Sequence, residues 1–483
     1  MAENAYPVIR PLTGRKEILT SEIVITRENV TDVLRNAYMK HLVNRSQIEY
    51  LYRYYKGDQP VLYREKEIRP EICNHVVENR ANAIVTFRTG YTVGKPIQYV
   101  SSVSDEAVSQ DIAHLNDVMR VNGKPSKDKQ LVEWQMIGGL GYRMILPSAS
   151  RRKVPFEFWT ADPRQTFVVK ANDIAHTPIL GVYYTVDDEQ NVTFHAYTND
   201  MYYRVEGWQS SVLKEATAHS VGSIPIIEYP LNMARLGAFE VVLPLLDALN
   251  DLDSNNLDSV AQTVQSLLIA VNCEFPEDTT ANMIRQAGMV ALRSVGENKA
   301  DIKIIGETLD QSQTQTLKQA ILDAINEIAG IPSQSNGNNS DSSNNGAVIL
   351  RNGWQGAETR AQDFEMMFRE PEQRFIEIAC DLSNRLGDMA LDPDMVDVKF
   401  TRRNYEDLLS KSQTLTTMLN NDKIHPQCAY EACGLFVDTQ DAYNMGMDWY
   451  EKQQEALAQQ EQPENTDEPL TERQHYVRGY WKD

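Results

Sequence analysis

Residues 236–271 read LGAFEVVLPLLDALNDLDSNNLDSVAQTVQSLLIAV, and this stretch decides the fold. At about 100° per residue, the valines and leucines from Val242 to Val271 fall on one side of a helix. The other side carries polar residues: Asp247, Asp251, Ser254, Asp258 and Gln265. From Pro244 to Val271 such a helix would span roughly 40 Å at 1.5 Å per residue, which is long for a compact domain. The pattern predicts a long amphipathic helix with a solvated acidic face.

A second amphipathic helix is predicted from Leu309 to Ala329, with Leu317 and Ile325 on its apolar side. Gly330 and Pro332 end it. Between the two helices the sequence alternates between short strand-like and helix-like runs: Thr280–Gln286, Met289–Arg293 and Ile302–Ile305. Two helices that flank a small mixed module indicate a stalk with a cap, although an ordinary helical hairpin inside one globular core gives the same pattern.

Length and charge limit the possible functions. A chain of 483 residues can bury more than one core, so several domains or one elongated molecule are expected. The formal net charge is -21, which argues against a surface that binds nucleic acid by neutralising phosphates. If DNA is a partner, it should slide past a wall that repels it.

The cysteines and the hydropathy pattern favour a soluble cytosolic protein. The five cysteines are scattered and contain no Cys-x-x-Cys pair, which fits assembly in a reducing compartment. No apolar run is long enough to span a bilayer, and the N-terminus lacks the apolar segment of a signal peptide.

The first half of the chain is predicted to pass from helices to strands. Asn29 begins a helix from Val30 to Tyr55, and further helices follow over residues 74–90, 105–121 and 126–137. Gly138, Gly139 and Gly141 mark the switch into strands. Residues 142–229 alternate between strand-like runs and turn residues, which predicts a twisted antiparallel sheet with helices on one side.

After Pro332 the composition changes abruptly. Residues 333–345 read SQSNGNNSDSSNN, which predicts a loop because the segment has no large apolar residue to bury. The loop lies between two helices, a place where long loops are usually functional. A helix over 357–386, kinked or interrupted at Pro371, comes next. A strand over 395–401 and helices over 405–420 and 438–459 complete the chain before an acidic tail.

The sequence contains few residues that indicate catalysis, cofactor binding or metal binding. The chain has no His-Glu-x-x-His, Walker-type, nucleophile-elbow or dinucleotide-binding motif, so no catalytic residue and no cofactor is predicted. His425, Cys428 and Cys433 lie close together, but three such residues without a second pair are better explained as structural than as a metal site. The glycines of GGLGY indicate a turn, since no Lys-Ser or Lys-Thr pair follows.

The order of several local strings resembles the portal proteins of tailed double-stranded DNA bacteriophages, of the siphophage type. The strings are YYKGDQP (from Tyr54), FRTGYTVGKPIQY (Phe87–Tyr99), HSVGSIPIIEYPLN (His219–Asn232), GAFEVVLPLLDALNDLDSNNLDS (Gly237–Ser259), NNGAVILRNGWQGAETRA (Asn344–Ala361) and VKFTRRNYED (Val398–Asp407). They extend over most of the chain, from about Tyr50 to Glu451. The resemblance depends on their order and spacing, because none is a catalytic signature.

The resemblance implies an elongated α+β portal fold with a mixed α/β wing, a two-helix stem with a small α/β clip, a long kinked helix and an α-helical crown. The implied divisions are an N-terminal arm and start of the first helix (1–48), the wing (49–235), stem helix 1 (236–271), the clip (272–308), stem helix 2 (309–332), the tunnel loop (333–346), the long kinked helix and a wing strand (347–404), the crown (405–460) and an acidic tail (461–483).

The resemblance also implies a role and partners. A dodecameric ring of this chain would occupy the unique capsid vertex of the virion, after assembly in the host cytoplasm. Double-stranded DNA would pass through it during packaging and ejection. The terminase packaging motor, the head-tail connector, and the major capsid and scaffold proteins would bind it, and no membrane would be involved. The protein would not be an enzyme.

Particular residues take roles under the resemblance. Asp247, Asp251 and Asp258 on the acidic face of the first stem helix would line the DNA channel. Asn336, Asn338, Asn339, Asp341 and Asn344 would belong to the tunnel loop. Which stem helix lines the bore stays open, and so does the alternative that the three acids face solvent on an outer surface.

Two other classes of function remain open. A hydrolase or nucleic-acid enzyme would need a pocket in the β-rich region, for example around Asp162 and His176 or His195. A different virion structural protein would share the helices without forming a closed ring.

Overall fold

The structure is a computed structural model, which describes residues 14–67, 70–103, 105–148, 154–264, 267–271, 273–274, 293–294, 301–305, 311–332, 354–401, 408–436 and 439–460. The chain divides into two compact units, Met1–Arg403 and Asn404–Asp483. Helices and strands are mixed in the first unit and the described elements of the second are helices, so the fold class is α+β as predicted.

A six-stranded sheet forms one part of the first unit, in the order β1-β5-β6-β7-β8-β9. Its strands are β1 (Ile18–Thr20), β5 (Thr166–Ala171), β6 (Pro178–Val186), β7 (Val192–Tyr197), β8 (Met201–Glu206) and β9 (Val212–Ala218). Only the β1–β5 pair is parallel among the ladders of this sheet. Helix α1 (Val30–Tyr55) covers one face, where Val33, Leu34 and Tyr38 pack against Phe167 and Phe194.

A second sheet and four helices form the larger core of the first unit. The three-stranded sheet has the order β10-β3-β4 (Ile226–Pro230, Leu140–Pro147, Phe156–Ala161). The helices are α2 (Arg80–Val93), α3 (Glu106–Val121), α4 (Lys124–Gly138) and α9 (Trp354–Arg385), and a short ladder joins β2 (Gln98–Ser101) to β15 (Val396–Lys399). The expectation of one antiparallel sheet over residues 142–229 is therefore wrong, because β3, β4 and β10 pair separately from the other strands.

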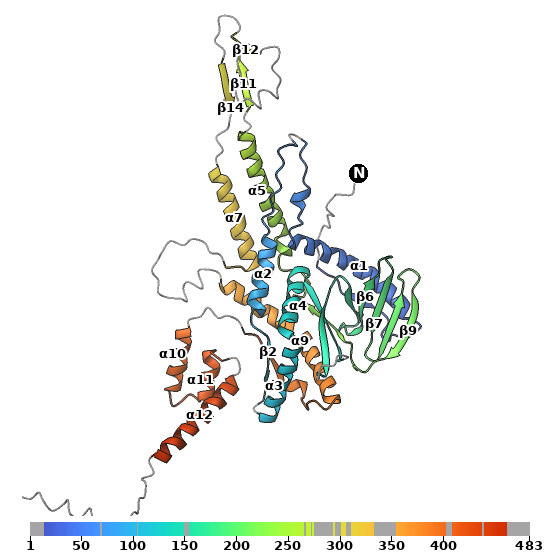
Figure 1. The fold of residues 1–483 in the computed structure, drawn as a ribbon, viewed down its shortest axis with the longest axis vertical. Coiled ribbons are helices and arrows are strands. Elements are labelled where there is room, and N and C mark those ends of the chain that lie inside the picture. Colours follow the sequence, from blue (N-terminus) through green and yellow to red (C-terminus); the bar gives the residue numbers. More distant parts are fainter. Residues whose placement is uncertain are drawn as a thin grey trace, which may run out of the picture. The chain divides into compact units, whose positions relative to one another are not determined.

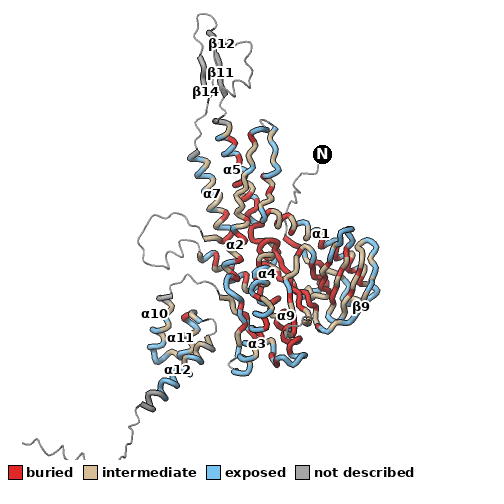
Figure 2. The backbone as a smooth tube through the Cα atoms, in the orientation of Figure 1, coloured by how far each residue is buried: buried red, intermediate tan, exposed pale blue. Residues whose placement is uncertain are grey.

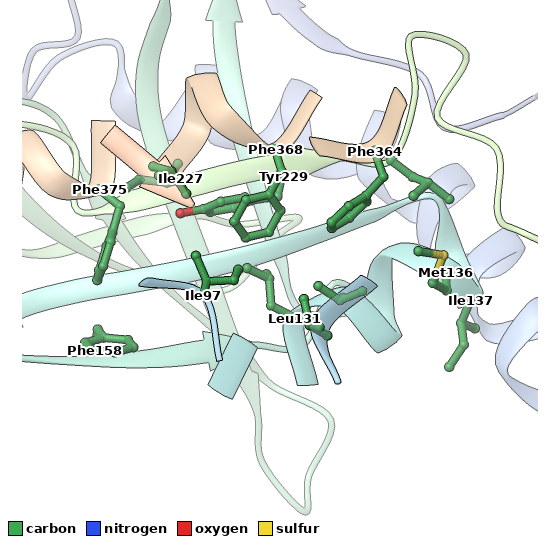
Figure 3. Close-up of a cluster of buried hydrophobic side chains, with 14 of the residues drawn as sticks. Ile97, Leu131, Met136, Ile137, Phe158, Ile227, Tyr229, Phe364, Phe368 and Phe375 are labelled. Atoms are coloured by element: carbon green, nitrogen blue, oxygen red, sulfur yellow. The ribbon is translucent and has the colours of Figure 1, made fainter. Parts of the chain in front are cut away.

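Helix α9 supplies aromatic side chains to this core. Figure 3 shows Phe364, Phe368 and Phe375 pointing from α9 toward the strands that carry Phe158 and Tyr229. Pro371 is buried in the middle of the helix, which runs from Trp354 to Arg385 without interruption. Packing on both sides of Pro371 thus outweighs the backbone hydrogen bond that a proline removes.

Four charged residues lie inside this core and form ion pairs with one another. Arg143 of β3 donates to Oε2 of Glu372 on α9 at 2.7 Å and to Asp128 on α4. Lys124 Nζ donates to Asp128 Oδ2 at 2.6 Å and lies 3.0 Å from Glu372 Oε1. The Tyr229 hydroxyl donates to Glu372 Oε2 at 2.9 Å. Burial raises the pKa of Glu372, but the charges of Arg143 and Lys124 outweigh it and lower the pKa to about 2.

The glycines at the end of α4 make the predicted switch from helix to strand. Gly139 follows the helix with φ +81°, in the left-handed region, and its N–H donates to the Gln135 carbonyl at 2.8 Å. A Cβ at Gly139 would lie 2.1 Å from the carbonyl oxygen of Arg235. Glycine at this position therefore allows the segment that carries Arg235 to approach the start of β3.

Helices α5 (Leu243–Val264) and α7 (Gln311–Ala329) follow, and they contact each other. The predicted continuation of the first helix to Val271 is wrong, because Leu267–Val271 is strand β11, paired antiparallel with β14 (Asp301–Ile305). The run LLIAV contains two β-branched residues, Ile269 and Val271, which favour extended backbone. A short ladder joins β12 (Cys273–Glu274) to β13 (Arg293–Ser294). The predicted turn over 280–286 lies outside the described residues.

Two further boundaries differ from prediction. Helix α2 begins at Arg80 instead of residue 74, because Asn79 is its N-cap and accepts a hydrogen bond from the Asn82 N–H at 3.2 Å. It continues to Val93, so Gly90 does not end it. Short 3-10 turns lie at Pro60–Tyr63, Glu240–Val242 and Pro393–Met395.

The described part of the second unit consists of helices α10 (Leu408–Leu419), α11 (Pro426–Cys433) and α12 (Thr439–Gln460). Helix α11 was not predicted. Figure 2 shows this unit mostly in the colours of intermediate and exposed residues. Large apolar side chains are among the exposed ones: Leu419, Phe436, Met445, Met447, Trp449 and Tyr450.

Candidate functional site

The polar face of α5 is the feature that the sequence singles out, and much of it is covered by another segment of the same chain. That segment connects α1 to α2; we call its described residues, 56–67 and 70–79, the strap. Figure 1 shows the strap beside α5. Val76 N–H donates to Ser254 Oγ at 3.0 Å, and Glu78 N–H donates to Asn250 Oδ1 at 2.8 Å. Backbone donors of the strap thus meet side-chain acceptors of the helix.

Asp258 anchors the far end of the strap. Its carboxylate forms ion pairs with Arg64 and Lys66, and it accepts from Asn74 N and Nδ2, both at 2.7 Å. The side chain is 2% exposed. Burial alone would raise the pKa of Asp258, but the hydrogen bonds from Lys66 and Asn74 lower it to about 2. The carboxylate is therefore ionised and paired at neutral pH.

The three predicted channel acids have different surroundings. Asp251 is exposed, whereas Asp247 is half-buried and accepts a hydrogen bond from the Tyr54 hydroxyl at 2.9 Å. The prediction of a solvated face is wrong at Ser254 and Asp258, which are both buried. The physical reason is that the strap supplies donors to that part of the helix.

A lysine joins α7 to this arrangement. Lys318 Nζ lies 2.9 Å from Asp253 Oδ1 on α5 and 3.0 Å from Glu78 Oε2 in the strap. Burial lowers the pKa of Lys318, but the hydrogen bonds from its nitrogen to the two carboxylates outweigh this and raise it. One ammonium group therefore connects both helices and the strap.

Both helices also present apolar side chains to solvent. Leu257 and Val260 on α5 are 49% and 38% exposed, and Leu317 and Ile328 on α7 are 52% and 41% exposed. Leu257 and Val260 are three residues apart and share a face of α5, and an exposed apolar face on a folded unit typically marks a contact with another protein. The predicted apolar stripe is thus buried at Val242, Leu246 and Leu249 but not farther along the helix.

The residues of the enzyme alternative do not form one site. His176 contacts Glu17 and lines a cavity of about 410 Å³ with Lys170, Glu228 and Arg374. Asp162 and His195 are not among the residues that line this cavity. Asp162 pairs with Arg164 at 2.6 Å, and His195 Nδ1 lies 2.8 Å from the Tyr202 hydroxyl. Each candidate side chain therefore has its own local partner.

The remaining predictions from the sequence concern the tunnel loop, a metal site and membrane-spanning segments. The tunnel-loop residues Asn336, Asn338, Asn339, Asp341 and Asn344 lie outside the described residues. His425 accepts from the Gln427 N–H at 3.3 Å at the start of α11, Cys428 is exposed and Cys433 is buried. In the part of the chain that the structure describes, no three His, Cys, Asp or Glu side chains gather in a way that could hold a metal ion. None of the described helices has the length and hydropathy to span a membrane.

The strap is the functional element that sequence reasoning missed. Its basic residues Arg64 and Lys66 were visible as a charged turn, but their partner Asp258 is 194 and 192 positions away. The available signal was charge complementarity between that turn and the acidic face of α5.

Comparison with known proteins adds a family match. Residues 36–466 match the model of a family described as phage portal protein, SPP1 Gp6-like. No curated protein matches the chain. A solved structure titled "Neck of empty GTA particle computed with C6 symmetry" is 13% identical, with a TM-score of 0.43 over 74% of this chain and 90% of that chain. Another, "Neck of native GTA particle computed with C12 symmetry", is 13% identical, with a TM-score of 0.42 over 81% of this chain and 94% of that chain.

Proposed function

Because the chain belongs to the SPP1 Gp6-like family of phage portal proteins, we propose that its copies form a closed ring at one capsid vertex and that the genome passes through it. The observation that carries this proposal is the family match over residues 36–466, which includes parts of both compact units. A dodecamer is the expected size. Such a protein is a structural component of the virion.

The exposed apolar residues of α5 and α7 support a ring. Leu257 and Leu317 are about half exposed in the single chain. In a ring each subunit presents one face to the neighbour on one side and a different face to the neighbour on the other. We assign Leu257, Val260 and Leu317 to such a contact, where burial would remove apolar surface from water.

Asp251 is our proposed channel residue. It is the exposed member of the three acids assigned to the bore, and its carboxylate would repel phosphates so that DNA slides. Asp247 and Asp258 then have a different task, which is to hold α1 and the strap against α5.

The remaining roles follow from family membership alone. Residues 272–308 would dock the terminase packaging motor and later the head-tail connector, and residues 333–346 would touch DNA. The motor would hydrolyse ATP. Scaffold and major capsid proteins would surround the ring during assembly in the host cytoplasm, and ejection would use the same channel.

Negative-stain microscopy and mass photometry of the purified protein test the ring. We expect particles with a central hole in the wild type. Leu317→Glu should lower the ring fraction several-fold, because it places a charge in the contact. Val121→Glu is the matched control, since Val121 on α3 is 46% exposed and lies outside the assigned contact. Monomers of the wild type at high concentration, without rings, would contradict the proposal.

A further inference from the structure

A small cavity between α2, the end of α7 and the start of α9 has an unusual lining. It is lined by Phe87, Arg88, Tyr91, Thr92, Gly330, Ala357, Arg360 and Ala361, and its volume is about 10 Å³. This is room for about one water-sized group. The cavity lies within the first unit, where α2 contacts α9, and it is separate from the strap and from Asp251.

Two arginines line this cavity, and neither has an acidic partner in the part of the chain that the structure describes. Arg360 Nη2 donates to the Ile328 carbonyl at 2.7 Å, and within the described residues the Arg88 guanidinium has no hydrogen bond or ion pair. The nearby Glu358 accepts instead from the Tyr91 hydroxyl at 2.9 Å and from Gln362 at 3.2 Å. The fully buried Arg15 and Arg143 have carboxylate partners, whereas the half-buried Arg88 and the exposed Arg360 have none among the described residues.

The electrostatics of the pair favour an anion. Burial lowers the pKa of Arg88, and the positive charge of Arg360 lowers it further, to about 10. Both side chains therefore remain charged at neutral pH, with a repulsion that nothing in the described surroundings offsets. A negatively charged group between them would remove the repulsion and satisfy the free N–H donors.

The backbone at Gly330 and a group of aromatic side chains form the walls of the cavity around the arginines. Gly330 has φ +69°, and a Cβ there would lie 2.5 Å from Arg360 Cδ, so the end of α7 confines that side chain. Phe87 stacks on Tyr91 at 5.8 Å between ring centroids, and Trp354 packs 5.9 Å from Tyr91.

We propose that Arg88 and Arg360 form a binding site for a phosphate group, with one of its oxygens entering the cavity between the two guanidinium groups. The phosphate is that of the DNA backbone or free inorganic phosphate. The site depends on the cavity and the two arginines, so it does not require the ring to exist.

Thermal unfolding of the full chain in phosphate, against chloride at equal ionic strength, tests the site. We expect phosphate to raise the wild-type Tm by a few degrees, and Arg88→Gln and Arg360→Gln each to remove most of that rise. In chloride, Arg88→Gln should melt no lower than the wild type, because it removes the repulsion. Arg120→Gln is the matched control, since Arg120 is 73% exposed and pairs with Asp117. It should keep the full phosphate response.

Fluorescence anisotropy with a short duplex DNA distinguishes the two sources of phosphate. If the backbone of DNA is the ligand, Arg88→Gln should weaken binding several-fold and reduce the salt dependence by about one released ion. If free phosphate is the ligand, DNA affinity should be unchanged while the loss of the phosphate response remains. The proposal is wrong if both the Tm response and the DNA affinity of the two variants equal those of the wild type.

Discussion

At the scale of a single residue, the Asp258 carboxylate holds the strap against α5. It is buried, and it pairs with Arg64 and Lys66 while accepting two hydrogen bonds from Asn74. Hydrogen bonds to charged groups contribute more than neutral ones, and removing one partner leaves the others partly desolvated.

We therefore expect Asp258→Asn to lower the free energy of unfolding by about 1–3 kcal/mol. The amide keeps the shape of the carboxylate but loses the charge that faces two cations. Urea unfolding measures the change, and trypsin cleavage after Arg64 and Lys66 should become faster. Asp251→Asn, at an exposed position, should change stability by less than about 0.5 kcal/mol. Equal effects of the two substitutions would show that Asp258 does not hold the strap.

His41 makes the first unit sensitive to mild acid. The ring is buried beneath the six-stranded sheet, Nε2 lies 3.2 Å from the Arg164 carbonyl, and the ring stacks on Phe167 with centroids 4.7 Å apart. Burial lowers the pKa of His41 to about 4. His41 is therefore neutral in the folded protein. As the pH falls, its imidazole is protonated in the unfolded chain before it is protonated in the folded one.

Acid should therefore destabilise the folded chain. The folded pKa is below the unfolded value of about 6.5, so this contribution to stability is complete above pH 6.5 and is lost as the pH falls toward 4. The loss should reach about 2 kcal/mol at pH 5. Denaturant titrations at pH 7 and pH 5 measure it. In His41→Phe the difference between the two pH values should be smaller by that amount, and an unchanged difference would exclude His41 as its source.

At the scale of elements, the turn between α4 and β3 depends on Gly139. Alanine there meets two obstacles, a left-handed φ and a carbonyl oxygen at 2.1 Å from its Cβ. We expect Gly139→Ala to destabilise the first unit by more than about 2 kcal/mol, measured by thermal or urea unfolding.

Gly138→Ala is the control for that turn. Gly138 lies at the end of the helix without a left-handed φ, and a Cβ there would be 3.3 Å from a side-chain carbon of Ile48 instead of 2.1 Å from a carbonyl oxygen. Its effect should be clearly smaller. Similar losses in both variants would indicate that general crowding, and not the turn, sets the requirement for glycine.

The elements themselves were predictable where local signals are strong. The helix over Val30–Tyr55 matches its prediction at both ends, and the helix predicted over 105–121 is α3, which begins at Glu106 with Asp105 as its N-cap. Strand β9 was not predicted because VLKEATA carries two charges and its residues are exposed or only partly buried, as suits a strand at a sheet edge. Helix α11 has only eight residues, too few for a clear period. The end of α5 was missed because LLIAV satisfies helix and strand patterns alike.

The site was less predictable than the fold, for a physical reason. Helical periodicity identified which residues of α5 share a face, and it correctly grouped Asp251, Ser254 and Asp258 away from Val242 and Leu246. Periodicity does not say what covers a face. The strap reaches α5 from residues 172 to 194 positions away, so its pairing depends on tertiary structure that no local pattern contains.

At the scale of the whole molecule, the second unit has little core of its own. Of its described apolar residues, Ala429 and Cys433 are buried, while Met445, Trp449 and Tyr450 on α12 are more than half exposed. A unit with so little buried apolar surface is only marginally stable by itself. Under the proposed ring, a second copy of the chain would cover this face of α12.

We expect Trp449→Ser with Tyr450→Ser to reduce the ring fraction in mass photometry, because the substitutions remove apolar surface from the contact. Unfolding of the first unit should be unchanged. Glu455→Gln is the control: Glu455 is exposed and lies about 120° and 140° around the same helix from Trp449 and Tyr450, so this variant should form rings like the wild type. If the double variant assembles as well as the wild type, α12 is not part of the subunit contact.

The ion pairs at Asp258 set the electrostatic profile of a closed ring along its axis. The two cations on this carboxylate alternate with the exposed Glu65 and Glu67, so the cluster keeps a net negative charge, and Asp251, seven residues earlier, is an exposed negative charge. At 1.5 Å per residue these positions are roughly 10 Å apart along α5. In the proposed ring, rotational repetition would turn each position into an acidic band, so a duplex moving through would meet two repulsive bands roughly three base pairs apart.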